Sequence, residues 1–250
     1  MERADFGVRD RTIAFLRDLK ERTGCRGFTV GLSGGIDSAV VTKLAADAVG
    51  GENVSNIFMP VDSTSRADYE CTERMSRMWG TSFKTINIQG PLDDIVSLTG
   101  STERIDIGNI AARIRMNILF NDARRKGNLV LGTSNRSELM MGYFTKFGDG
   151  ACDAMPICGL YKTQVRQLAS LIDVPEDIIS KPPSAGLWEG QTDEGDMDIT
   201  YENLDIILDA LDCGKDPKDV VCESISLEDI QRISARVSAM SHKVSPPYRP

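Results

Sequence analysis

The stretch TVGLSGGIDSAVVTKLAADA, residues 29–48, joins a short apolar run to a helical pattern through two glycines and two serines. A glycine pair after a buried strand lets the backbone turn tightly and brings its N–H groups close to a ligand. The helix expected from about residue 36 adds unpaired N–H groups and a partially positive end. Because the hydroxyls of Ser33 and Ser38 can donate further hydrogen bonds, the stretch predicts an anion-binding loop.

A plain strand-to-helix turn, with Asp37 or Ser38 as the helix cap, is the alternative for this loop. The loop lacks the lysine of the nucleoside-triphosphate motif G-x-x-x-x-G-K-[ST] and the spacing of the dinucleotide motif G-x-G-x-x-G. It does follow the first expected strand, and ligands of open α/β sheets bind at the carboxyl ends of the strands. That position favours the anion site over the plain turn.

Apolar, β-rich runs alternate with helical patterns in the first two thirds of the chain, which is typical of a parallel sheet covered on both faces. We therefore expect a doubly wound α/β fold of about five strands, with the sheet core at about 25–160. The expected strands are 28–32, 54–59, 83–88, 128–132 and, with a weaker pattern, 153–157, and the helices among them are 36–49, 65–79 and 103–126.

Beyond the expected sheet the pattern becomes mostly helical, so the prediction is a single domain, 1–250, with a helical C-terminal part at about 161–250. Its expected helices are 162–172, 201–212, 215–222 and 227–241. The stretch 180–200 is rich in Pro, Gly and Asp and has no helical or strand period. A loop of that length in a compact domain is often a lid, and we expect a mobile lid at about 181–200.

The charge balance and the cysteines limit the possible functions. The 250 residues carry a formal net charge of −8, which disfavours a general nucleic-acid binder. No apolar run is long enough to span a membrane and no targeting segment stands out, so the prediction is a cytoplasmic protein without membrane contact. Six cysteines without a C-x-x-C pair, and a single histidine, disfavour a zinc site and suit a reducing compartment.

The expected helix 103–126 carries two apolar stripes, which indicates burial on two sides. One side can cover the sheet, and the other is expected to face a second subunit in a homodimer. The alternative is one helix buried deeply in a monomer. The stripes run through Ile107, Ile110, Ile114 and Ile118, and through Ala112, Met116, Phe120 and Ala123.

Two levels of resemblance narrow the function. The string Ser33-Gly34-Gly35-Ile36-Asp37-Ser38 resembles the pyrophosphate-binding loop of the ATP pyrophosphatase superfamily, whose members split ATP into AMP and pyrophosphate. Four further segments, in order along the chain, resemble the ammonia-dependent NAD synthetase family. They are NIAARIRMN (109–117), GTSNRSELMMGYFTKFGDGACDAMPICGLYKTQVRQLA (132–169), KPPSAGLWEGQTDE (181–194) and HKVSPP (242–247).

The resemblance implies a Rossmann-like fold of the adenine nucleotide alpha hydrolase type, with ATP as co-substrate and Mg²⁺ as cofactor. It assigns Mg²⁺ to Asp37 and Glu138. The residues implied for ATP are Gly31, Leu32, Ser33, Gly34, Gly35, Ile36, Asp37, Ser38, Thr133, Lys162 and Ser184. Those implied for deamido-NAD are Arg113, Lys146, Asp153, His242 and Lys243.

Local chemistry supports some of these assignments and leaves others open. A lysine at a helix start, such as Lys162, is unfavourable to the helix dipole unless an anion lies nearby. Glu138 could be an ordinary helix-start carboxylate, and Arg113 a side chain whose stem covers the core. We interpret His242, the single histidine, as a substrate contact rather than a general base.

The reaction implied is attack of the nicotinate carboxylate on the α-phosphorus of ATP, followed by attack of ammonia on the adenylate. A chain whose loop begins at residue 31 leaves no room for an amidotransferase domain before it, so free ammonia is the expected nitrogen source. The alternatives are a GMP synthetase-like or tRNA-thiolating ligase, and a non-catalytic module that senses ATP. One departure from the family is 195–198, GDMD, where a Leu-Gly pair is common; it falls within the expected lid.

Overall fold

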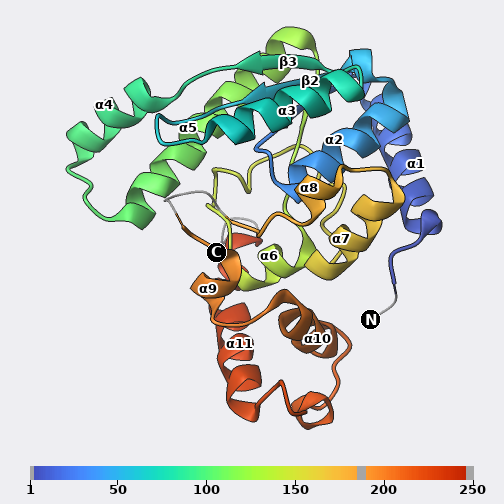
Figure 1. Ribbon diagram of the computed structural model, residues 1–250, viewed down its shortest axis with the longest axis vertical. Helices are drawn as coiled ribbons and strands as arrows, with labels where there is room; N and C mark the ends of the chain where they lie inside the picture. The colour runs from blue at the N-terminus through green and yellow to red at the C-terminus, as the bar shows by residue number, and fades with distance from the viewer. Residues whose placement is uncertain (1–2, 185–189, 246–250) are drawn as a thin grey trace, which may run out of the picture.

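The computed structural model describes residues 3–184 and 190–245, and its centre is a sheet of four parallel strands in the order β3-β2-β1-β4 (Figure 1). Residues 185–189 of the expected lid and the pair Pro246-Pro247 lie outside the described residues. The strands are β1 (Phe28–Gly31), β2 (Val54–Phe58), β3 (Ser82–Thr85) and β4 (Leu129–Leu131). The doubly wound architecture expected from the alternating pattern is confirmed.

Helices cover both faces of this sheet. One face is covered by α1, α2, α3 and α7, and the other by α4 and α5. The helices are α1 (Phe6–Thr23), α2 (Ile36–Val49), α3 (Arg66–Met78), α4 (Gln89–Thr99), α5 (Arg104–Lys126), α6 (Arg136–Met141), α7 (Lys162–Leu171), α8 (Glu176–Ile179), α9 (Asp193–Met197), α10 (Tyr201–Asp212) and α11 (Leu227–Met240), with 3₁₀ turns at Gly51–Asn53, Pro217–Val220 and Ser241–Lys243.

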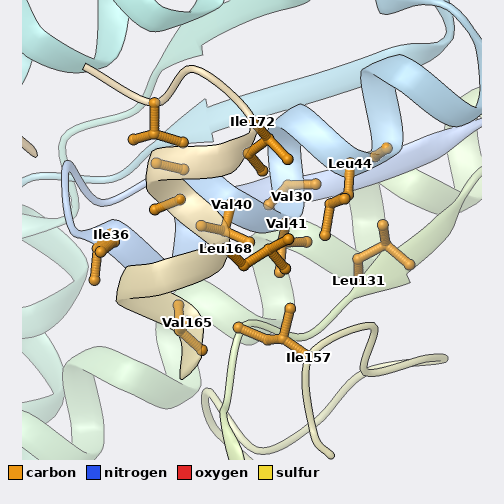
Figure 2. Close-up of a cluster of buried hydrophobic side chains, with 14 of the residues drawn as sticks. Val30, Ile36, Val40, Val41, Leu44, Leu131, Ile157, Val165, Leu168 and Ile172 are labelled. Carbon is orange, nitrogen blue, oxygen red and sulfur yellow. The ribbon is translucent and has the colours of Figure 1, made fainter. Parts of the chain in front are cut away.

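The largest core cluster lies between the sheet and the helices α2 and α7 (Figure 2). Val30 and Leu131 face it from the strands, and Val40, Leu44 and Leu168 from the helices. Each such side chain removed from water contributes about 1.5–3 kcal/mol to folding. This packing fixes the start of α2, and with it the loop after β1, at the carboxyl end of the sheet.

The helices α10 and α11 form a second core below the sheet, with α6 and α7 lying between them and the strands (Figure 1). Tyr201, Leu204 and Ile207 of α10 pack there with Ile230 and Ile233 of α11. Met141 of α6 and Tyr161 before α7 belong to the same cluster. The helical C-terminal part is therefore packed directly on the two helices that continue from the sheet.

The expected fifth strand at 153–157 is wrong, because only a single bridge, Leu131 to Ala154, forms there. The side chain of Asp153 accepts a hydrogen bond from Val130 N at 2.7 Å, and the chain then turns at Met155 and Pro156. Proline has no N–H to donate to a strand ladder. The sheet therefore has four strands where about five were expected.

Three helical expectations also need correction. The expected helix 215–222 is only the 3₁₀ turn Pro217–Val220, since Cys222 N donates to Ile225 O in a β-bridge rather than to a helical carbonyl. The expected aperiodic loop 180–200 contains α9, whose first turn is capped by Thr192 Oγ1 accepting from Gly195 N. Helix α4 was not expected, because Gly90 and Pro91 hide its start; proline is tolerated in a first helical turn.

Helix α5 spans 23 residues and uses its two stripes differently. Ile107, Ile110 and Ile118 pack with the buried Ile114 against β2 and α4. Ala112 and Ala123 of the second stripe are buried, whereas its two large members, Met116 and Phe120, are half-buried. Across residues 3–184 and 190–245, no helix combines the length and apolar character that crossing a bilayer requires.

Candidate functional site

The site is built where the strand order reverses. β1 pairs with β2 on one side and with β4 on the other, so the loops after β1 and β4 leave the sheet side by side. In open α/β sheets this switch point is where ligands bind, outside the carboxyl ends of the strands. The stretch Ser33–Ser38 spans the loop after β1 and the first residues of α2, and the loop after β4 contains Thr133–Asn135.

The loop after β1 has the geometry of an anion site. Gly34 has φ +84°, a conformation that a residue with a side chain rarely adopts, and Gly35 is the N-cap of α2. Because Gly35 occupies the N-cap position, neither Asp37 nor Ser38 is the N-cap, and no side chain caps the helix. The two serine hydroxyls lie 3.1 Å apart, and Ser38 Oγ also donates to Gly35 O at 2.9 Å. This network ties the loop to the first turn of α2.

Asn135 connects the two loops. Its Nδ2 donates to Asp37 Oδ1 at 2.9 Å, across the gap between β1 and β4. Asn135 is also the N-cap of α6, where a capping box forms: its Oδ1 accepts from Glu138 N, and Glu138 Oε2 accepts from Asn135 N. The capping box orients the Glu138 side chain, because its carboxyl must reach back to the start of its own helix.

Lys162 lies between these two carboxylates. Its Nζ donates to Asp37 Oδ2 at 2.5 Å and to Glu138 Oε1 at 3.3 Å, and its side chain is only 2% exposed. Lys162 begins α7, and its backbone N donates to Ser137 Oγ, which in turn donates to the buried Asp205 of α10. Asp37, Glu138 and Lys162, which the family resemblance assigned to ATP and metal, thus converge from α2, α6 and α7.

The charges of this cluster are poorly balanced. Burial and the neighbouring Asp37 raise the pKa of Glu138 to about 8, although Lys162 opposes this shift. Burial works against the charge of Lys162, but Asp37 and Glu138 raise its pKa above the ordinary value. Two carboxylates therefore share one ammonium group, and additional positive charge at this place would relieve their repulsion.

Two residues of the cluster were not expected from the sequence. Asp193, at the start of α9, is 3% exposed, and its Oδ2 accepts from the hydroxyl of Tyr201 at 3.0 Å. Its other oxygen, Oδ1, is buried without a hydrogen-bond partner among the described residues. The ammonium of Lys162 lies 5.3 Å from the centre of the Tyr201 ring. The only sequence signal for Asp193 was its place in the motif GQTDE.

The donor set fits a magnesium ion of the kind that binds with substrate. Asp37 and Glu138 offer two hard oxygen ligands that repel each other, and the partnerless Asp193 Oδ1 adds negative potential nearby. In residues 3–184 and 190–245, no three His, Cys, Asp or Glu side chains are grouped as a complete metal cage. Magnesium usually binds one or two carboxylates and takes its other ligands from water and phosphate.

A second cluster of cations lies at the other end of α6. Lys243 Nζ donates to the carbonyl oxygens of Gly142 and Phe144, and Lys146 Nζ donates to His242 O at 2.6 Å. Arg113 of α5 joins the cluster through the Lys146 carbonyl, at 3.4 Å. The structure thus gathers Arg113, Lys146, His242 and Lys243, which the sequence had assigned together to one substrate.

Asp153, Thr133 and Ser184 are the other polar residues expected in the site. Asp153 is exposed, and its described side-chain hydrogen bond goes to the β4 backbone rather than to the cation cluster. Thr133 is half-buried and lies just after the carboxyl end of β4. Ser184 is exposed at the edge of the described part of the 181–200 segment. The roles of these three residues, like those of the other expected site residues, remain predictions.

A hollow of about 330 Å³ opens at the carboxyl end of β2, next to the loop of β1. Pro60 and Val61 line it after the strand, and Ser65, Arg66 and Tyr69 line it from the start of α3. Small-molecule sites have volumes of about 300–1,000 Å³, so this open hollow lies at the lower end of that range.

These features define a nucleotide-binding α/β protein with an anion loop at the switch point of its sheet. The NAD synthase family model matches residues 8–247, and the chain belongs to this family. A similar relative is the NH(3)-dependent NAD(+) synthetase of Methanococcoides burtonii, 43% identical over 96% of this chain and 93% of the relative.

Two solved structures are similar in fold and sequence. NMN synthetase from Francisella tularensis has a TM-score of 0.87 and 35% identity, covering 98% of this chain and 97% of that one. NH3-dependent NAD synthetase from Campylobacter jejuni has a TM-score of 0.83 and 30% identity, with 97% of each chain covered. Both comparisons span the sheet and the helical C-terminal part.

Proposed function

We propose that this chain amidates deamido-NAD to NAD with free ammonia, consuming ATP and releasing AMP and pyrophosphate. The observation that carries the proposal is the convergence of Asp37, Glu138 and Lys162 on the anion loop, in a chain of the NAD synthase family. An anion loop with two carboxylates beside it suits a nucleoside triphosphate bound with a divalent cation.

In the first step, ATP lies with its terminal phosphates against Ser33–Ser38 and its nucleoside in the hollow at the end of β2. A nicotinate carboxylate oxygen bonds to the α-phosphorus, and the bond to the bridging oxygen breaks to release pyrophosphate. The loop N–H groups and hydroxyls stabilise the charge that develops on this leaving group. Lys162 contributes a fixed positive charge that burial keeps in place.

In the second step, the ammonia nitrogen bonds to the acyl carbon, the bond from that carbon to the AMP oxygen breaks, and the added nitrogen loses a proton to water. The chain's own contribution is positioning, so no covalent enzyme intermediate is needed. Asp37 and Glu138 would hold Mg²⁺, which when bound neutralises charge on the phosphates. The segment around Ser184 would help to exclude water from the adenylate, which water would otherwise hydrolyse.

The cation cluster is the proposed site for deamido-NAD. Arg113, Lys146 and Lys243 offer positive charge to a dinucleotide that carries two phosphates and a carboxylate. Helix α6 joins this cluster to the anion loop, with Glu138 at its start and Gly142 at its C-cap. We also propose a homodimer through α5, supported by the half-buried Met116 and Phe120.

The test is incubation of the protein with ATP, Mg²⁺, ammonia and deamido-NAD, followed by chromatography of the products. AMP and NAD in equal amounts are the expected result. Formation of ADP, or a lack of turnover with this acceptor, would contradict the proposal. Replacing Asp37 or Ser38 by alanine should abolish both products together, because both contribute to the phosphate site.

A second candidate is supported by the similarity to the Francisella tularensis NMN synthetase. The same chemistry on a mononucleotide would convert nicotinate mononucleotide into NMN. Measuring kcat/KM for both acceptors under identical conditions separates the candidates. We expect deamido-NAD to be preferred, and a preference for the mononucleotide would reverse the assignment while leaving the ATP chemistry intact.

A further inference from the structure

Lys181 places an ammonium group beside the anion loop. It follows α8 by two residues, and its Nζ donates to Asp68 Oδ1 at 2.5 Å. Asp68 lies in the first turn of α3 and is packed against Gly34: a Cβ built on Gly34 would lie 3.5 Å from Asp68 Oδ1 and 3.6 Å from Asp68 O. The Lys181 ammonium and the Gly34 backbone therefore flank the same carboxylate.

The anion loop itself carries no positive charge, so cations such as Lys162 come from other segments of the chain. Between Gly31 and Ser38 there is no lysine or arginine, and the charge of Lys162 is already shared by Asp37 and Glu138. Asp68 adds a negative charge at the edge of the loop, where it would repel a bound phosphate. Lys181 is the cation that the structure sets against Asp68.

We propose that Lys181 is a phosphate-positioning residue, whose ammonium bridges Asp68 and a terminal phosphate oxygen of the nucleotide held by Ser33–Ser38. The proposal rests on the proposed function, and it adds a residue to the phosphate site. An ammonium group has three donors, so it can keep Asp68 while binding a phosphate. With a side chain that is 42% exposed, Lys181 also retains room for a second partner.

The backbone after Lys181 is restrained, which makes the position of the ammonium reproducible. Pro182 and Pro183 limit the backbone dihedral angles of the segment, and Pro183 O accepts a hydrogen bond from Asp193 N at 3.0 Å. Asp193 in turn belongs to the Lys162 cluster through Tyr201. A restrained cation binds a ligand with a smaller loss of conformational entropy.

A purely structural strap between α3 and the α8 region is the competing explanation, and the structure contains a control for it. Arg74 of α3 donates to Asp177 of α8, so a second ion pair joins the same two regions. The three atoms nearest to a Cβ built on Gly34 belong to Asp68 and Thr72, and none belongs to Arg74. If the Lys181 pair is only a strap, loss of either pair should have the same effect on nucleotide binding.

The experiment measures equilibrium binding of ATP and of pyrophosphate, each with Mg²⁺, by titration calorimetry on the whole chain. The variants are Lys181→Ala, Lys181→Arg, Asp68→Asn, Arg74→Ala and the double variant Lys181→Ala/Asp68→Asn. We expect Lys181→Ala to weaken both ligands about tenfold or more, as for a lost charge-assisted hydrogen bond. Lys181→Arg, Asp68→Asn and Arg74→Ala should stay within about threefold of the wild type.

The double variant decides the role of the ammonium. If Lys181 contacts phosphate, removing Asp68 as well restores only part of the affinity, and binding stays at least about fivefold weaker than in the wild type. Full recovery in the double variant would mean that Lys181 only neutralises Asp68, and it would overturn the inference. Equal binding by Lys181→Ala and the wild type would also overturn it. Failure of the wild type itself to bind ATP would instead contradict the proposed function.

Discussion

Asp205, a fully buried residue of α10, holds the first turn of α7 through Thr163: its Oδ2 accepts from both Thr163 N and Thr163 Oγ1 at 2.8 Å. Its Oδ1 accepts from Ser137 Oγ, whose neighbour in sequence is Glu138. A residue of the C-terminal helices thereby orients the two short segments that begin α6 and α7. Those segments carry Glu138 and Lys162 into the site.

Replacing Asp205 by alanine should therefore lower both stability and activity. The change leaves the Thr163 and Ser137 donors without a buried acceptor, at a cost of about 3 kcal/mol in the free energy of unfolding. Urea denaturation measures that loss. Asp205→Asn keeps the size and an acceptor oxygen, so it should retain more stability than Asp205→Ala, while the KM for ATP rises in both. Unchanged KM for ATP in both variants would mean that Asp205 does not position the site.

Glu138→Gln should separate stability from function. The pKa of Glu138, about 8 in the folded protein, exceeds its ordinary value of 4.5, so unfolding releases a proton between these pH values. Stability of the metal-free protein should therefore fall as pH rises through this window. The glutamine side chain does not titrate, so the melting temperature of the variant should change less between pH 6 and pH 8 than that of the wild type.

Activity of the same variant should fall about a hundredfold, because one proposed metal oxygen is lost. Thermal melting without Mg²⁺ and steady-state assays across a Mg²⁺ titration measure the two effects. A Glu138→Gln enzyme with full activity at low Mg²⁺ would contradict the proposed role of this carboxylate.

Gly132→Ala should destabilise the protein by overpacking. A Cβ on Gly132 would lie 2.7 Å from Cys152 Sγ and 3.2 Å from Met155 Cγ, so the chain after β4 would have to shift. The expected loss is about 1–3 kcal/mol in the free energy of unfolding. Gly159→Ala, with no atom within 4 Å of its Cβ position, is the matched control and should be nearly neutral. Equal denaturation midpoints would show that the segment relaxes freely.

The cysteines should differ in reactivity. Burial raises the pKa of Cys152 to about 11, whereas a hydrogen bond with Ser224 lowers the pKa of the exposed Cys222. Since the thiolate is the nucleophile, iodoacetamide at pH 8 should modify Cys222 at least about ten times faster than Cys152. Peptide mass spectrometry over time measures both rates. Faster modification of Cys152 would indicate that the segment after β4 opens readily.

Local sequence patterns predicted much of the fold. Alternating apolar runs predicted the four strands and the covering helices α2, α3 and α5, because burial on both faces of a parallel sheet requires such runs. The fifth strand failed at Pro156, and the helix at 215–222 failed after Val220. At Pro156 the missing backbone donor decided the conformation, and after Val220 the bridge between Cys222 and Ile225 did.

The residues of the candidate site were predicted in two ways: the loop from its short local motif, and distant residues such as Glu138 and Lys162 from the family resemblance. Ser33, Gly34 and Asp37 stand within one loop, and a short motif is sufficient to identify them. Asp193, Tyr201 and Asp205 escaped notice, because their significance comes from contacts with distant segments. Ser137 and Asp205 are 68 positions apart, yet their side chains are hydrogen-bonded.

By itself the sequence determined the class of fold, the anion loop and the chemical types of the site residues, since these depend on local periodicity and on motifs. Only the tertiary structure decided which charges share a partner: Lys162 lies 125 positions from Asp37 and Lys181 lies 113 positions from Asp68. The order β3-β2-β1-β4 brings the first and fourth strand ends together. Electrostatic interactions depend on distance in space, and the chain reaches those distances only after the sheet and the C-terminal helices have packed.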